Sequence, residues 1–184
     1  MADRRAGKRQ GPYVPSPGGG TEPRSRNKDG EWRTGSRSYA LDVMDYSGTI
    51  DQDVDVTGDL VISGQMNGGV TVQGGARLRL TGQTNGDVFV LEGASLWQSG
   101  QLNGVLICQG WADITGQING KVVVEGGVVL VAEGVQRNTN ARHLVLDASG
   151  HWTRTEFPSV TRVTPDAPRW RWNQDGSMTL QPLG

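Results

Sequence analysis

The sequence predicts an all-β protein, a single-stranded β-solenoid (β-helix) of about six coils of 16–18 residues each. Two observations predict this fold. A six-residue phrase recurs four times at steps of 18, 18 and 16 residues, and so short a period is typical of coils that stack on one another. Between the copies, short runs alternate apolar and polar residues and end at glycines, which indicates strands separated by turns.

The repeated phrase is Gly-Gln-x-Asn-Gly preceded by Ser or Thr, and its copies occupy residues 63–68, 81–86, 99–104 and 115–120. Weaker echoes at Gly48, Gly134 and Gly150 extend the series over residues 47–150. Stacked amides can hydrogen-bond along the axis, and Asn tolerates the left-handed backbone conformation of a corner. We therefore expect the amides to build corners. An amide array that binds sugar or ice is the alternative.

The strands supply columns of apolar residues that we expect to form the core. One column contains Val54, Val70, Val88, Leu106 and Val122, and a second contains Val56, Val72, Val90, Cys108 and Val124. The second strand of each coil supplies Leu60, Ile62, Leu78, Leu80, Leu96, Ile114, Val128 and Leu130, and the repeated phrase supplies Ile50, Met66, Thr84, Leu102 and Ile118. Because Cys108 falls in a valine column, we expect a buried and inert thiol.

The chain divides into three segments. Residues 1–39 are rich in Gly and Pro and hold nine Lys/Arg against four Asp/Glu, which predicts a disordered basic tail. Residues 40–150 form the predicted solenoid. Residues 151–184 carry three of the six tryptophans and four of the eight prolines, which predicts a cap or hairpin segment. Residues 170–180 resemble a hairpin around a glycine turn.

The tail is expected to act through its charge. Its cationic side chains include Arg4, Arg5, Lys8 and Arg9, which suit an acidic partner, a membrane surface or nucleic acid. A leader that only increases solubility is the alternative. The chain has no run of about eighteen apolar residues, and its single cysteine fits a reducing compartment. We expect a cytoplasmic protein that can meet a membrane at its periphery.

Motifs for catalysis are missing from the sequence. It has two histidines, His143 and His151, no Cys/His ligand spacing, no Walker-type loop and no Gly-x-Ser-x-Gly. We therefore expect no enzyme, no cofactor, no metal site and no small-molecule substrate. An 18-residue coil equals three hexapeptides, so an enzyme like the left-handed β-helix acyltransferases is an alternative. The repeats of this chain, however, contain no histidine that could serve as the catalytic residue of such an enzyme.

The chain resembles the bactofilins over about residues 41–150. The resemblance rests on the stacked phrases Gly-Asp-Leu-x-Ile-Ser-Gly, Asn-Gly-x-Val-x-Val and Glu-Gly-Ala-x-Leu. Bactofilins are bacterial cytoskeletal proteins with a β-helical core, so the resemblance implies self-assembly into filaments or a scaffold through the helix ends, without a nucleotide. The alternative function is a rigid β-helical binding or decoration module of a phage, virion or scaffold.

Three sets of residues are candidate contact sites. At the first coil, Leu41 and Val43 are expected to stack against another copy through the open end of the solenoid. Phe89, Ile107 and Val123 are expected to form an outward apolar stripe, covered either by a neighbouring copy or by residues 151–184. The expected cap residues are Trp152, Phe157, Trp170 and Trp172.

Overall fold

The computed structural model describes residues 13–15, 21–23, 37–39, 44–140, 142–156 and 163–182, with side chains from residue 45 onward. It divides the chain into two units, Met1–Gly35 and Ser36–Gly184. In the first unit, β1 (Tyr13–Pro15) pairs antiparallel with β2 (Thr21–Pro23). Residues 1–39, predicted to be a disordered tail, include the short strands β1, β2 and β3 (Arg37–Tyr39). Arg4, Arg5, Lys8 and Arg9 lie outside the described residues.

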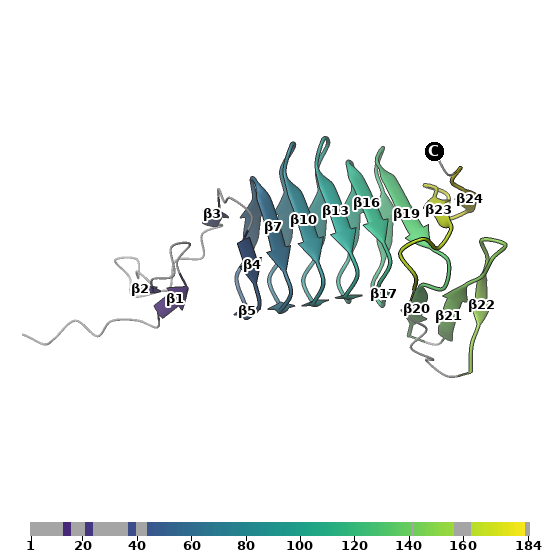
Figure 1. The fold of residues 1–184 in the computed structure, drawn as a ribbon, viewed down its shortest axis with the longest axis horizontal. Coiled ribbons are helices and arrows are strands. Elements are labelled where there is room, and N and C mark those ends of the chain that lie inside the picture. Colours follow the sequence, from purple (N-terminus) through teal and green to yellow (C-terminus); the bar gives the residue numbers. More distant parts are fainter. Residues whose placement is uncertain are drawn as a thin grey trace, which may run out of the picture. The chain divides into compact units, whose positions relative to one another are not determined.

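The second unit winds through three parallel sheets, and Figure 1 shows their strands as successive rungs. Sheet I contains β3 (Arg37–Tyr39), β6 (Val54–Val56), β9 (Val70–Val72), β12 (Val88–Val90), β15 (Leu106–Cys108) and β18 (Val122–Val124). Sheet II contains β4 (Met44–Tyr46), β7 (Asp59–Ile62), β10 (Arg77–Leu80), β13 (Ser95–Gln98), β16 (Trp111–Ile114) and β19 (Val128–Ala132). Sheet III contains β5 (Thr49–Ile50), β8 (Gln65–Met66), β11 (Gln83–Thr84), β14 (Gln101–Leu102), β17 (Gln117–Ile118) and β20 (Gln136–Thr139).

The solenoid prediction is confirmed. Each coil passes once through sheets I, II and III, and the pairings between successive rungs are parallel from β3–β6 to β17–β20. Five steps separate the six rungs of each sheet, so the chain makes about five turns. The described residues contain no helix, and therefore none with the length and apolarity of a membrane span.

The predicted core columns face inward, with one exception. Val70, Val88, Leu96, Leu102 and Leu106 are fully buried. In the last coil, however, the register pairs Ala112 with Val129 and Ile114 with Val131, so Val128 and Leu130 face outward. The step from Ala112 to Val129 is one residue longer than the 16-residue step before it. A shift of one residue moves every side chain of a strand to the other face.

The glycines of the repeated phrase allow successive coils to approach closely. A Cβ atom added at Gly82 would lie 1.8 Å from the carbonyl oxygen of Gly64, and one added at Gly86 would lie 1.9 Å from that of Gly68. Only a residue without a side chain fits at such a distance. The second and sixth positions of the phrase are therefore glycine because these corners pack backbone against backbone.

The asparagines of the phrase form a hydrogen-bonded ladder along the axis. Each Nδ2 donates to the Oδ1 atom of the preceding coil over 2.7 Å, from Asn119 through Asn103, Asn85 and Asn67 to Asp51. The expected corner role is thus visible in the contacts. The expected left-handed conformation is wrong, because the described residues other than glycine have no positive φ angle.

Beyond β20 the chain turns back and extends two sheets with antiparallel strands. In sheet III, β21 (Arg142–Leu146) pairs with β20, and β22 (Trp152–Arg154) pairs with β21. In sheet II, β23 (Arg169–Trp172) pairs with β19 and with β24 (Met178–Leu180), which confirms the predicted hairpin. The parallel stack thus ends at Thr139 and not at residue 150. Gly150 has a φ of +76° in the turn between β21 and β22, so it is not the corner of another coil.

Candidate functional site

The first coil leaves an open end. Strands β3, β4 and β5 are the terminal strands of their sheets among the described residues. The carbonyl groups of Gly48 and Ile50 accept hydrogen bonds from the next rung, so the alternation of a parallel ladder points the N–H and C=O groups of Thr49 away from it. Ile50 is only half-buried, whereas Met66 in the next rung is fully buried. The predicted contact residues Leu41 and Val43 lie outside the described residues.

The opposite end is closed by aromatic side chains. Trp170 and Trp172 of β23 are 8% and 5% exposed and belong to the core. The ring of Trp152 lies 5.7 Å from that of Trp172. Three of the four expected cap residues thus pack at the end of the last coil, and the fourth, Phe157, lies outside the described residues.

Arg137 completes this closure from within the last coil. It pairs with Ile118 in sheet III, so it takes the place of an inward-facing apolar residue. Its guanidinium lies 5.0 Å from the ring centroid of Trp172 and 5.8 Å from that of Trp152. Burial lowers the pKa of Arg137, and stacking on indole faces is favourable for a partly desolvated guanidinium. Arg137, Trp152 and Trp172 thus form one cluster at the end of the last coil.

The outward stripe occupies the outer face of sheet I. Phe89 pairs with Ile107, and Ile107 pairs with Val123, so the three side chains lie in register on successive rungs. Phe89 is 36% exposed, and the other two are half-buried. In the described part of the C-terminal segment, β23 pairs with β19 in sheet II instead. The prediction that this segment covers the stripe thus finds no support in its described contacts.

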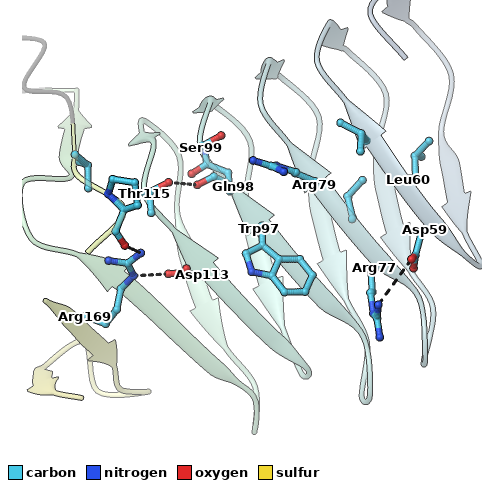
Figure 2. Close-up of a pocket in the computed structure, with 14 residues that line it drawn as sticks. Asp59, Leu60, Arg77, Arg79, Trp97, Gln98, Ser99, Asp113, Thr115 and Arg169 are labelled. Carbon is cyan, nitrogen blue, oxygen red and sulfur yellow. Dashed lines mark hydrogen bonds and ion pairs between the residues drawn. The ribbon is translucent and has the colours of Figure 1, made fainter. Parts of the chain in front are cut away.

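A groove runs along the outer face of sheet II (Figure 2), with a volume of about 620 Å³. One outward side chain from each of four successive rungs lines it, namely Val61, Arg79, Trp97 and Asp113. Arg169 donates to Asp113 over 2.9 Å and forms one end of the groove. At the other end Arg77 lies 3.8 Å from Asp59.

Few groups in the described residues could carry catalysis. Burial raises the pKa of the Cys108 thiol to about 11, so it is protonated at neutral pH and a poor nucleophile. His143 and His151 are exposed and lie beyond the parallel stack. No group of three or more His, Cys, Asp or Glu residues is placed to hold a metal ion within the part of the chain that the structure describes.

The groove was not predicted from the sequence. The outward column of sheet I was predicted but that of sheet II was not, although the same alternation places Arg79 and Trp97 outside when Leu78, Leu80 and Leu96 are inside. The alternation of the strands therefore contained enough information to predict the outward residues of the groove. The end of the groove at Arg169 could not be predicted in this way, because it depends on a contact with Asp113 across 56 positions of the chain.

The chain has no match among protein-family models, curated proteins or solved structures.

Proposed function

We propose that this chain is a non-enzymatic structural protein that self-associates through the open end of its solenoid. The observation that carries the proposal is the contrast between the two ends. Among the described residues, the first coil ends on three unpaired parallel strands, whereas at the last coil only β18 of sheet I has no further strand beside it. Such edges are templates for pairing with another chain. A second copy presents the same three edges, so the contact can be self-complementary.

The closed end limits what this contact can build. A filament made only by end stacking needs two free ends, whereas the last coil is followed by antiparallel strands and tryptophans. End stacking alone therefore joins two copies, first coil to first coil. A larger assembly needs a lateral contact, and the stripe of Phe89, Ile107 and Val123 is the surface proposed for it.

The bactofilin resemblance supports the same function, because it implies assembly of β-helices without a nucleotide. Filament formation as in that family is the finer proposal, and it requires both the end contact and the stripe. The basic tail remains the proposed contact to an acidic partner, a membrane surface or nucleic acid.

Sedimentation velocity over a range of protein concentrations tests the end contact. Thr49→Pro removes an N–H group that points to the open side, and Thr49→Lys keeps the N–H group but adds a charge to the edge. Both variants are expected to sediment as single copies at concentrations where the wild type associates. The matched control is Arg154→Pro in β22, the last strand of sheet III, which should leave association unchanged.

Two results would contradict the end contact: a wild type whose sedimentation does not depend on concentration, or folded Thr49 variants that associate normally. The stripe is tested separately by Phe89→Lys combined with Ile107→Lys. This double variant is expected to keep the pair and lose larger assemblies. If wild-type assemblies never exceed two copies, the filament proposal is wrong while the paired solenoid stands.

A further inference from the structure

The groove on sheet II has the form of a site for a chain-like ligand. It crosses four neighbouring strands, from β7 to β16. With strands about 4.8 Å apart, it extends roughly 15 Å along the solenoid axis. Its volume of about 620 Å³ lies in the range typical of ligand sites. An elongated groove of this size suits a few units of a linear polymer.

An aromatic platform stands in the middle of the groove. Trp97 is 39% exposed, although it is one of the largest apolar side chains of the chain. The ring of Trp111 lies 5.1 Å from that of Trp97 at an angle of 58° and supports it from the next rung. The indole is therefore held in place before a ligand arrives, which lowers the entropic cost of binding. Figure 2 shows Trp97 between the Arg77–Asp59 pair and the Arg169–Asp113 pair.

The groove is positive on an acidic body. Three arginines and two aspartates line it, whereas residues 40–184 hold nine Lys/Arg against fifteen Asp/Glu. Two of the arginines face the aspartates in ion pairs. Arg79 is exposed and makes no ion pair or hydrogen bond with the described residues. Because Arg79 lies directly opposite Trp97 in the register, a stacked ring can place an anionic group against the free guanidinium.

The chemistry of the lining separates the classes of linear anionic ligand. A peptide needs partners for its backbone groups, but the backbone of β10 and β13 is already paired with both neighbouring strands. Nucleic acid is disfavoured because it would bring a phosphate at every nucleotide close to the carboxylates of Asp59 and Asp113. A sugar chain fits better: its C–H face stacks on an indole, and its hydroxyl groups can bond to carboxylates, to guanidinium groups and to the hydroxyls of Ser99 and Thr115.

We propose that the groove over β7, β10, β13 and β16 binds an acidic oligosaccharide, with one sugar stacked on Trp97 and its carboxylate paired with Arg79. Neighbouring sugars lie along the solenoid axis toward Asp113 and Arg169. This binding site is independent of self-association, because its residues lie on sheet II and not on the open edge or on the stripe of sheet I.

Binding of the full chain to an array of uronate-containing, sialylated and neutral oligosaccharides tests the proposal, followed by calorimetric titration with the best-bound acidic glycan. Trp97→Ala is expected to weaken binding about ten-fold or more. Arg79→Gln is expected to weaken the binding of acidic glycans about ten-fold and to change the binding of neutral glycans little. It should also reduce the salt dependence of the affinity for acidic glycans. Phe89→Ala and Arg154→Gln are matched controls, because each removes an exposed side chain of the same kind away from the groove.

The proposal is overturned if no glycan on the array binds, or if the bound glycan has the same affinity for folded Trp97→Ala. Equal affinity of Arg79→Gln and wild type for the acidic glycan would also overturn it. A poly-dT oligonucleotide and inorganic polyphosphate serve as competing probes. If either probe binds more tightly than the best glycan and this binding is lost in Arg79→Gln, the groove is a site for phosphate polymers and the oligosaccharide proposal is rejected.

Discussion

The repeated coils and the closing segment hold the same core in different ways. In the coils, each contact recurs at every rung: a glycine against the preceding backbone, an asparagine on the preceding asparagine, and an aliphatic residue on the one below. In the closing segment no contact recurs. Trp152, Trp170 and Trp172 fill individual places, and Arg137 lies against two of the rings.

This difference explains why the two ends are not equivalent. A repeating contact does not end by itself, so in the described part of the chain the first coil ends on unpaired strands. Termination requires residues that break the repeat, and the structure places them at Arg137 in the last coil and in the strands that follow Thr139. Antiparallel strands and bulky rings then replace the next coil. The repeat therefore leaves pairing edges at the first coil, whereas antiparallel strands take the place of the next coil at the other end in sheets II and III.

Removal of one aromatic ring from the closing segment is expected to have the largest effect on stability. Trp172→Ala is expected to lower the free energy of unfolding by about 3–5 kcal/mol, because it leaves a cavity beside Trp152 and Arg137. Urea denaturation measures the change. Trp172→Phe is the matched control and should cost much less.

The same variant also tests the role of the segment in association. If the tryptophans close the last coil, folded Trp172→Ala leaves that end open. The variant is then expected to associate at lower concentrations than the wild type in sedimentation velocity. A loss of only a few tenths of a kcal/mol, with unchanged association, would show that the tryptophans do not close the end.

A methyl group at a corner tests the repeat itself. Gly82→Ala would place a Cβ atom 1.8 Å from the carbonyl oxygen of Gly64, so neighbouring coils must move apart. We expect a cost of about 1–3 kcal/mol in urea denaturation. Gln83→Ala in the same corner changes only an exposed amide and should cost less. If Gly82→Ala is as stable as the wild type, the close packing of the corners is not a requirement of the fold.

The sequence predicted the part of the molecule that repeats. The four phrases placed the corners, and the alternation between them placed Val70, Val88 and Leu106 in the core, because each position is supported by equivalents in other coils. The last coil lacked this support. Its strand reads Val-Val-Leu-Val-Ala, which has no alternation, so the pattern could not distinguish Val129 and Val131 from Val128 and Leu130.

The closing segment was predictable in kind but not in detail. Its tryptophans and the glycine turn at Gly176 indicated a capping hairpin. The role of Arg137 was not predictable, since a charged residue rarely occupies an inward position. Its place depends on two rings that are 15 and 35 residues away along the chain. The same limit applies to the wall of the groove, where Arg169 meets Asp113.

The amide ladder allows a finer comparison within the repeat. Asn85 donates to Asn67 and accepts from Asn103 and Gln83, so Asn85→Ala removes three hydrogen bonds. Asn119 donates to Asn103 and accepts from Gln117, so Asn119→Ala removes two. We expect a loss of about 1–2 kcal/mol at Asn85 and a smaller loss at Asn119. Equal or reversed losses in urea denaturation would show that the ladder does not act as a connected row.

The smallest expected effect is in the turn between β21 and β22. The backbone N–H groups of His151 and Ser149 donate to the Asp147 carboxylate over 2.9 and 2.8 Å, and these bonds lower the pKa of Asp147 below its ordinary value of 3.8. The ionised carboxylate therefore stabilises the folded turn above about pH 4. This stabilisation is lost as the pH falls through the lowered pKa of the folded state.

The melting temperatures of the wild type and Asp147→Asn, measured from pH 7 down to pH 2, separate this contribution from other acid effects. The wild type is expected to be slightly more stable at neutral pH, and the difference should vanish in acid. A carboxylate that water can reach competes with water for the same donors, so the effect should be smaller than any removal of a buried ring. A difference that persists at pH 2 would mean that Asp147 acts through its shape and not through its charge. The turn would then resemble the repeat, which is held by packing and neutral amides.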